Sequence, residues 1–324
     1  MTMKLLAKFS LGVSALSASL LFTASTALSE SLKKVVVGHD LWVGYSGAFV
    51  AEEKGFFEQN GLNVDFVQFP GPGDTLPALI TGKLDIGLTT LHNLALASLG
   101  EGVELKAVYL LDTSDGADAI VASTNIKNVS DLKGKTVAAT ENEVNHLMLI
   151  AALDSVGLSE KDIKFVNMNA EDAGAAFVAG KLDAAVTWEP WVTKASSNGG
   201  NIIFTSADIP DTILDAVVVS PEDLKSSKES ISAFISAIDR GVKYMEANPT
   251  ESHKIISKYL DIPAAEIEEM LATDKIYDMD ENKKLFKGPA SISLEKVVSF
   301  LKSKQLIPAG STGEKLLDDS LIAY

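Results

Sequence analysis

Residues 79–90 read Leu-Ile-Thr-Gly-Lys-Leu-Asp-Ile-Gly-Leu-Thr-Thr, and residues 177–188 read Phe-Val-Ala-Gly-Lys-Leu-Asp-Ala-Ala-Val-Thr-Trp. In both copies an apolar helical run precedes the Gly-Lys-Leu-Asp core and an apolar strand follows it. Gly82 and Gly180 stand where a helix commonly ends with one residue at positive φ. We interpret this internal repeat as two related α/β lobes with a cleft between them.

Outside the repeat, short apolar runs alternate with helical patterns. This alternation predicts parallel sheets with right-handed crossovers. Beyond residue 221 the pattern is mostly helical. The expected strands are residues 35–38, 62–69, 84–88, 105–110, 119–122, 136–139, 163–166, 182–186, 202–204 and 214–219. The expected helices are residues 48–59, 74–81, 93–99, 144–156, 170–179, 190–197, 230–246, 250–259, 264–271 and 293–304.

The lobe boundaries follow from the positions of the two repeat copies. We expect lobe 1 to comprise residues 30–113 and 214–324, and lobe 2 to comprise residues 114–213. The chain then crosses between the lobes twice, and two crossing segments form a hinge that closes around a ligand. The expected fold class is therefore α/β, with two doubly wound lobes.

The first 29 residues have the layout of a signal peptide. Lys4 and Lys8 form a basic start, residues 9–29 carry no charge, and small residues near position 27 suit cleavage. A membrane anchor is the alternative, because a spanning helix needs about 20 apolar residues. Serine and threonine dilute this stretch, so we expect removal of residues 1–29 and a periplasmic protein. The chain has no Cys, which excludes a lipid-modified cysteine and disulfides.

The charge balance argues against several classes of partner. The formal net charge of the chain is −16, and Lys4 and Lys8 contribute +2, so residues 30–324 carry −18. Nucleic acids and anionic membrane surfaces attract basic proteins, and this composition disfavours both. The simplest interpretation of this net charge is a soluble acidic secreted protein.

Several segments, in order along the chain, resemble a known family. They are Trp42-Val-Gly-Tyr45, Ala51-Glu-Glu-Lys-Gly-Phe-Phe57, Asn60-Gly-Leu-Asn-Val64, Asp131-Leu-Lys-Gly-Lys-Thr-Val137 and Ala179-Gly-Lys-Leu-Asp-Ala-Ala-Val-Thr-Trp-Glu-Pro-Trp191, together with the first repeat copy. The chain resembles the substrate-binding components of the nitrate/taurine/sulfonate group of ABC importers, which includes thiamine-pyrimidine binders. The resemblance implies the bilobal periplasmic-binding fold, an ABC permease as partner and a monomer, without fixing the ligand.

Ligands of such sheets lie beyond the carboxyl ends of the strands. Six loops qualify, residues 38–48, 88–93, 111–118, 140–146, 187–193 and 210–216, and none contains Lys or Arg. They hold nine carboxylates and all three tryptophans. We expect ligand contacts from Asp40, Trp42, Tyr45, Thr90, Asp115, Glu141, Trp188, Glu189, Trp191 and Asp215. The alternative is that Asp40, Glu141 and Asp215 cap helices and that the tryptophans belong to the core.

These loops indicate a cationic ligand. Aromatic faces and carboxylates attract an amine, a quaternary ammonium, an amidine or a guanidinium. An oxyanion such as nitrate or a sulfonate favours Arg, Lys or helix N-termini. Taurine, alkanesulfonate or nitrate binding stays the alternative within the same family, with a sulfonate held by helix ends.

An enzyme and a ligand sensor are the two alternatives to a transport protein. An enzyme is disfavoured because no nucleophile elbow, P-loop, dinucleotide fingerprint or metal-binding helix is present. The pyrimidine-synthesising relatives of the fold are cytosolic, unlike a chain with a signal peptide. A sensor that docks on a membrane receptor would use the same closed form. We expect no cofactor and no metal.

Overall fold

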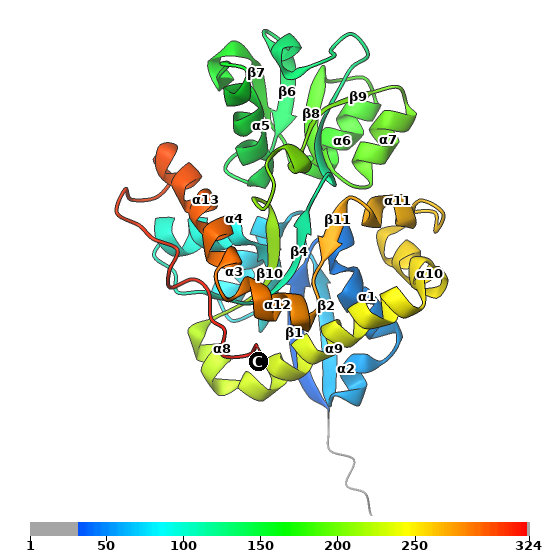
Figure 1. Ribbon diagram of the computed structural model, residues 1–324, viewed down its shortest axis with the longest axis vertical. Helices are drawn as coiled ribbons and strands as arrows, with labels where there is room; N and C mark the ends of the chain where they lie inside the picture. The colour runs from blue at the N-terminus through cyan, green and yellow to red at the C-terminus, as the bar shows by residue number, and fades with distance from the viewer. Residues whose placement is uncertain (1–31, 323–324) are drawn as a thin grey trace, which may run out of the picture. The chain divides into compact units, whose positions relative to one another are not determined.

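The computed structural model describes residues 32–322, which lie in one compact unit (Figure 1). The predicted signal peptide lies outside the described residues. Two separate β-sheets organise this unit, and helices cover both faces of each. No helix among residues 32–322 combines the length and the apolar character needed to cross a membrane.

The first sheet has six strands in the order β11-β4-β10-β3-β1-β2. β2 and β3 run parallel to β1, whereas β10 runs antiparallel to β3 and β4. The bounds of these strands are β1 Lys33–His39, β2 Leu62–Gln68, β3 Ile86–Thr90, β4 Lys106–Ser114, β10 Leu214–Val219 and β11 Asp274–Ile276.

The second sheet has five strands in the order β7-β6-β8-β5-β9. β7 and β8 run parallel to β6, and β5 runs antiparallel to β8 and β9. The bounds of these strands are β5 Asp118–Ala122, β6 Thr136–Ala139, β7 Lys164–Asn167, β8 Ala184–Trp188 and β9 Asn201–Thr205.

The two sheets share one plan, which confirms the duplication predicted from the repeat. Reading β6 to β9 for β1 to β4, and β5 for β10, converts one strand order into the other, apart from the edge strand β11, which has no counterpart in the second sheet. The expectation of parallel sheets is wrong for three strands, because β11 runs antiparallel to β4 at one edge and β5 and β10 are reversed within their sheets. β5 and β10 share one position in the course of the chain. Each is the first strand after the chain crosses from the other sheet. It therefore enters at the edge where the parallel strands end.

Helices pack on both faces of each sheet. In the first sheet α1, α9 and α10 cover one face, while α4 and α13 cover the other. In the second sheet α5 lies on one face and α6 and α7 on the other. The helices are α1 Ser46–Glu53, α2 Phe56–Gln59, α3 Leu76–Ile80, α4 Leu91–Ala95, α5 Val144–Ser155, α6 Ala170–Val178, α7 Trp191–Ser197, α8 Pro221–Ser226, α9 Lys228–Ala247, α10 Pro249–Leu260, α11 Ile267–Leu271, α12 Met279–Leu285 and α13 Pro289–Ser303. Short turns of helix are η1 Val43–Tyr45, η2 Pro72–Thr75, η3 Leu96–Gly100, η4 Val129–Leu132, η5 Glu160–Asp162 and η6 Ser206–Asp208.

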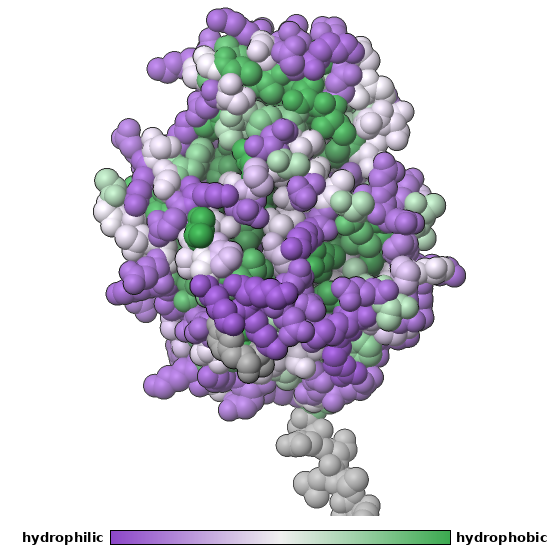
Figure 2. Space-filling view, in the orientation of Figure 1, coloured by the Kyte–Doolittle hydropathy of each residue, from purple (hydrophilic) through white to green (hydrophobic). Residues whose placement is uncertain are grey.

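Two features of the helices differ from the expectation. The helix expected over residues 48–59 is divided into α1 and α2, because Gly55 takes φ +67°. The sequence pattern also missed α8, β11 and α12. Hydrophilic side chains cover most of the lower part of the face shown in Figure 2, over α9 and its neighbours. Such a surface agrees with the high charge of the chain.

Both copies of the repeat make the same local bonds. Gly82 and Gly180 have φ values of +69° and +70°. Asp85 accepts a hydrogen bond from the Val36 N–H of β1, at 2.7 Å. Asp183 likewise accepts one from the Thr136 N–H of β6, at 2.8 Å. The Gly-Lys-Leu-Asp core therefore ends a helix and then fixes the next strand to its parallel neighbour, β1 in the first sheet and β6 in the second.

The chain passes between the sheets directly after β4 and directly before β10. The predicted lobe boundaries at residues 113 and 214 fall at these points and stay predictions. A third segment braces the first passage, because the Thr273 carbonyl accepts hydrogen bonds from the N–H groups of Asp115 (2.9 Å) and Ala117 (3.1 Å).

Candidate functional site

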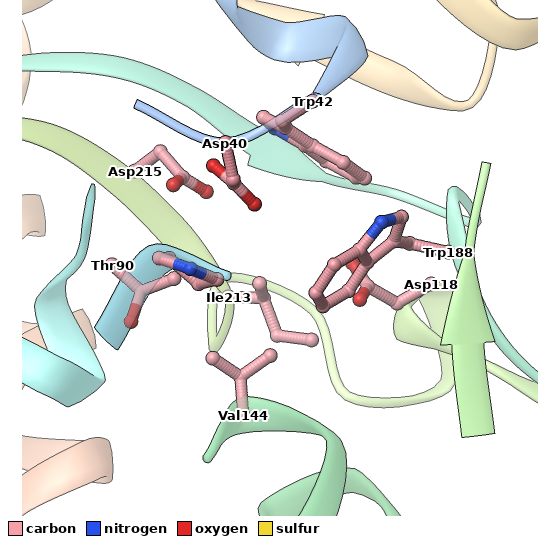
Figure 3. A pocket seen from close by; sticks show the side chains of 9 residues that line it. Asp40, Trp42, Thr90, Asp118, Val144, Trp188, Ile213 and Asp215 are labelled. Carbon is pink, nitrogen blue, oxygen red and sulfur yellow. The ribbon is translucent and has the colours of Figure 1, made fainter. Parts of the chain in front are cut away.

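A cavity of about 260 Å³ lies where the two sheets approach each other (Figure 3). Both sheets and the segments between them supply its walls. Three carboxylates, one hydroxyl and five apolar or aromatic side chains line it: Asp40, Trp42, Pro72, Thr90, Asp118, Val144, Trp188, Ile213 and Asp215. This volume counts all the space between the lining atoms, part of it open to solvent, so the cavity leaves room for a small solute only.

The first sheet contributes the ends of neighbouring strands. Asp40 directly follows β1, and Thr90 ends β3, where its hydroxyl caps α4 by accepting from the Asn93 N–H at 3.1 Å. Asp215 pairs with Thr90 across the β3–β10 ladder, so both lie at the same edge of the sheet. The Tyr45 hydroxyl donates to Asp215 Oδ1 at 2.6 Å and fixes that carboxylate from behind.

The second sheet contributes an equivalent pair. Trp188 ends β8, and Asp118 begins the reversed strand β5 directly opposite it. Asp118 is a candidate contact residue that was not among the predicted ones, although it lies in the loop of residues 111–118, which was predicted to face the ligand. A signal existed, because Asp118-Ala-Ile-Val opens β5 as Asp215-Ala-Val-Val opens β10. A reversed strand brings its first residue, and not its last, to the ligand edge.

Aromatic and aliphatic side chains form the rest of the wall. Trp42 and Trp188 face the space from different sheets, with Val144 and Ile213 below them in Figure 3. The Trp42 Nε1–H donates to Asp112 Oδ1 at 3.2 Å, which fixes the ring. Trp188 Nε1, in contrast, has no hydrogen-bond partner among the described residues. One indole N–H is thus left for a ligand acceptor or for water.

The three carboxylates of the cavity share an unusual electrostatic position. Asp40, Asp118 and Asp215 are each at most 3% exposed, and no Lys or Arg lines the cavity with them. Burial raises the pKa of Asp118 to about 7 and that of Asp215 to about 6, with the Tyr45 hydroxyl opposing the second shift. Burial and then the charge of Asp215 raise the pKa of Asp40 well above its usual value. A positive group in the cavity would therefore stabilise all three ionised forms.

Two further carboxylates lie behind this layer. Asp112 is fully buried on β4, and Asp274 is buried on β11 beside it. Burial is the main cause that raises the pKa of each. The charges of Asp274 and Asp215 raise the pKa of Asp112 further, and the charges of Asp215 and Asp118 raise that of Asp274. The negative potential of the cavity thus extends into the segments that join the sheets.

Five of the predicted contact residues line the cavity: Asp40, Trp42, Thr90, Trp188 and Asp215. Asp40, Thr90 and Asp215 are all buried, so none of them is simply a helix cap at the protein surface. Asp215 lies within a strand, and only Thr90 caps a helix.

The other five predicted residues lie around the cavity without lining it. Tyr45 is behind Asp215, and Glu189 accepts hydrogen bonds from the N–H (3.0 Å) and hydroxyl (2.9 Å) of Thr193 in α7. Trp191 packs against Gly174 of α6, with Lys194 Nζ 4.4 Å from its ring centre. Asp115 and Glu141 are exposed. Loop membership placed these residues near the site, but it did not determine the direction of their side chains.

Metal binding finds no support in this geometry. Within residues 32–322, no three His, Cys, Asp or Glu side chains are arranged to hold a metal ion. The three carboxylates of the cavity come from separate segments, since Asp40 follows β1, Asp118 begins β5 and Asp215 lies in β10. The arrangement can enclose a small molecule, neutralise a positive group and stack a flat one.

Known proteins resemble this chain over most of its length. A binding protein of Brucella abortus strain 2308 is 27% identical over 277 residues, which are 84% of this chain and 85% of that protein. An Escherichia coli K12 protein named for binding aliphatic sulfonates is 27% identical over 204 residues, 62% of this chain and 63% of that protein. The solved alkanesulfonate-binding protein of Xanthomonas axonopodis pv. citri, bound to MOPS, has a TM-score of 0.75 at 20% identity.

That structure covers 88% of this chain and 98% of its own, so it shares the bilobal periplasmic-binding fold. The fold class expected from the sequence is therefore confirmed. The NMT1/THI5-like family model matches residues 42–252, a range that includes the ends of β3 and β8 and the starts of β5 and β10. By this match, which spans most of both sheets and the cavity between them, the chain belongs to the NMT1/THI5-like family.

Proposed function

We propose that this chain is the extracytoplasmic solute-binding component of an ABC importer and that its solute carries a positively charged nitrogen group. The relatives named above are binding proteins, which supports the first part. One observation carries the second part. Asp40, Asp118 and Asp215 line a cavity that offers no basic side chain to pair with them.

The argument for a cation is energetic. An ionised carboxylate that is buried without a partner is strongly unfavourable, so it takes up a proton or acquires a counter-charge. Lys34, Lys54 and Lys258 form ion pairs at the surface with Asp65, Glu251 and Glu53, and not with the three cavity carboxylates. A cationic solute supplies the missing counter-charge. The indoles of Trp42 and Trp188 add an attraction of about 0.5–2 kcal/mol for a cation over their faces.

The same geometry gives the mode of capture. Asp40, Trp42, Thr90 and Asp215 come from the first sheet, while Asp118, Val144 and Trp188 come from the second. A solute that contacts both groups favours the arrangement in which the sheets approach each other. An importer can then recognise the loaded form. Ligand contacts from Asp40, Trp42, Thr90, Asp118, Trp188 and Asp215 are part of this proposal.

Sulfonate or nitrate binding is the second candidate, and the names of relatives favour it. An oxyanion would face three carboxyl groups and would need them protonated. The donors available to it in the cavity are the Thr90 hydroxyl and the free Trp188 Nε1–H. Charge complementarity thus favours the cation over the oxyanion.

A thermal-shift screen of residues 30–324 tests the proposal. One arm contains guanidinium at low millimolar concentration, choline, short primary amines and thiamine pyrimidine, and the other contains taurine, alkanesulfonates and nitrate. A ligand at 100 times its Kd stabilises the native state by about 2.7 kcal/mol, which the screen detects. We expect shifts with the cations, absent in Asp118→Asn and Asp215→Asn. A shift with the oxyanions alone would overturn the cation assignment and leave the binding role intact.

A further inference from the structure

A second cavity, here called the side cavity, lies beside the first but is not part of it. It encloses about 480 Å³, partly open to solvent. Leu76 and Pro77 of α3 and Leu96 of η3 form its apolar walls, and Asn93 and Glu143 line it as polar groups. Its lining residues Gly73, Asn93 and Glu143 lie within three positions of Pro72, Thr90 and Val144 of the first cavity, so the same segments line both cavities.

The polar groups of the side cavity have unused hydrogen-bonding capacity. Asn93 is 2% exposed, and its Oδ1 has no hydrogen-bond partner among residues 32–322. Glu143 Oε2 is buried and equally without a partner in that part of the chain. Buried polar atoms in native proteins are nearly always hydrogen-bonded, so these two acceptors, and the Asn93 Nδ2 donor that is equally without a partner in the described chain, require an explanation. A ligand that brings N–H donors would satisfy both acceptors.

The backbone is shaped around this polar pair. A Cβ atom at position 73 would overlap Glu143 Oε1 and would approach Asn93 Nδ2 to 3.0 Å, so a side chain there would displace the carboxylate from its present position. The helix that carries Asn93 continues into a π-helical turn at Leu96–Gly100, and Leu96 lines the cavity. Single π-helical turns occur frequently at functional sites.

The side cavity is assembled from both halves of the molecule. Glu143 precedes α5, which packs on the second sheet, whereas Gly73 and Asn93 belong to elements of the first sheet. An adjacent contact joins the same two regions, because His92 Nε2 lies 2.8 Å from the Asn142 carbonyl oxygen. The polar end therefore exists only while these two regions are in contact.

We propose that the side cavity is a second binding site, separate from the importer's solute site, for a small primary ammonium compound with a short branched aliphatic body. The ammonium group donates to Glu143 Oε2 and Asn93 Oδ1, and the aliphatic body lies against Leu76, Pro77 and Leu96. Because the polar end is shared between the two halves, the occupant stabilises their contact. An occupant of the side cavity therefore strengthens binding of the solute in the first cavity. By linkage, the solute in the first cavity strengthens binding of that occupant by the same factor.

The test uses 3-methylbutylammonium as the probe on residues 30–324, followed by ¹H–¹⁵N NMR. The Asp118→Asn/Asp215→Asn double variant removes the charges of the first cavity, so binding that remains reports on the side cavity. We expect saturable shifts of the Gly73 backbone and Asn93 side-chain amide signals in this variant. Glu143→Gln, which keeps the shape of the side chain, should weaken the remaining binding at least tenfold.

Glu101→Gln is the matched control, since Glu101 lines the outer, exposed end of the side cavity and loses the same charge. It should change the affinity less than twofold. Leu96→Trp, which fills the half-buried wall, should abolish binding, with its thermal unfolding recorded to verify folding. Loss of all probe binding in the double variant, or equal effects of Glu143→Gln and Glu101→Gln, would overturn the second site. Neither result bears on the solute proposed for the first cavity.

Discussion

The two halves of the first cavity are built on the same backbone and carry different side chains. In the first sheet Thr90 ends β3 opposite Asp215, and in the second sheet Trp188 ends β8 opposite Asp118. The aspartate is the same in both halves, whereas a small hydroxyl residue in one corresponds to a large indole in the other.

This comparison distinguishes the feature that both halves share, the aspartate, from the feature that differs between them, the residue at the end of the parallel strand. Both halves present a buried carboxylate on a reversed strand, which gives the enclosed space a negative potential from two directions. At the end of the parallel strand, the second half has the indole of Trp188. The first half has Thr90 at that position, and its hydroxyl caps the following helix α4. The repeated feature supplies charge recognition, and the unequal feature gives the ligand one orientation.

The largest expected effect concerns the repeated aspartates. Asp118→Asn and Asp215→Asn should each weaken binding of the cation identified by the screen by about 2–5 kcal/mol, because each removes one partner of a buried charge pair. Isothermal titration calorimetry measures the loss. Asp115→Asn, at an exposed position, should leave the affinity unchanged. A loss confined to Asp215→Asn would break the equivalence of the two halves.

The pH dependence of stability tests the same pair without ligand. The folded-state pKa values of about 7 for Asp118 and about 6 for Asp215 lie above the usual 3.8, so the folded chain retains protons that the unfolded chain releases. Stability should therefore fall between about pH 4 and pH 7, at about 1.4 kcal/mol for each unit of pKa shift and each group. Urea denaturation of the ligand-free protein at several pH values measures this slope.

The asparagine variants serve as controls for that slope. Asp118→Asn should flatten the profile mainly toward pH 7 and Asp215→Asn mainly toward pH 6. Cation affinity should rise over the same interval, because the carboxylates must ionise to pair with it. A stability that rises from pH 4 to pH 7 in wild type, with no change in either variant, would contradict the raised pKa values.

The two indoles should differ in their contribution to stability. Trp42→Phe removes the donor to the buried Asp112, whereas Trp188→Phe removes an N–H with no partner in the described chain. The first variant should therefore lose about 1–3 kcal/mol more unfolding free energy than the second, since an unsatisfied buried group is costly. Chemical denaturation compares them, and equal losses would mean that the Trp42–Asp112 bond adds nothing.

The smallest expected effect concerns the shared scaffold. Gly82→Ala and Gly180→Ala place a side chain at φ near +70° in open space, so each should cost about 1–2 kcal/mol for the backbone alone. Gly310→Ala also meets open space but lies outside the positive-φ range, and it should cost little. Unequal losses at positions 82 and 180 would show that the two copies of the repeat are not energetically equivalent.

Much of the fold was predictable because local and long-range signals agree. Gly82 and Gly180 end helices as expected, and the strand–helix alternation gave the sheet class. The reversed direction of β5 and β10 was not predictable from periodicity, since a buried strand has the same pattern in either direction. Short elements such as β11 lack enough residues to show a period.

The candidate site was predictable to the level of strand ends. Asp40, Trp42 and Thr90 follow parallel strands, and the rule about carboxyl ends places them at the ligand edge. The rule does not give the direction of a side chain within a turn. Glu189 therefore bonds to its own helix and Trp191 packs on α6. Asp118 escaped selection because that rule refers to strand ends, whereas Asp118 begins a strand.

Three buried carboxylates in or directly behind the cavity lie next to the segments that join the two sheets. Asp112 lies two residues before the end of β4, Asp118 begins β5, and Asp215 is the second residue of β10, so all three flank the passages between the sheets. Where these groups are ionised, their mutual repulsion would oppose the approach of the two sheets, and a bound cation would remove that repulsion. Recognition and movement thus reside in the same few residues. If a biosensor for another solute were engineered from this protein, each substitution at these residues would therefore also change how closely the two sheets approach each other without ligand.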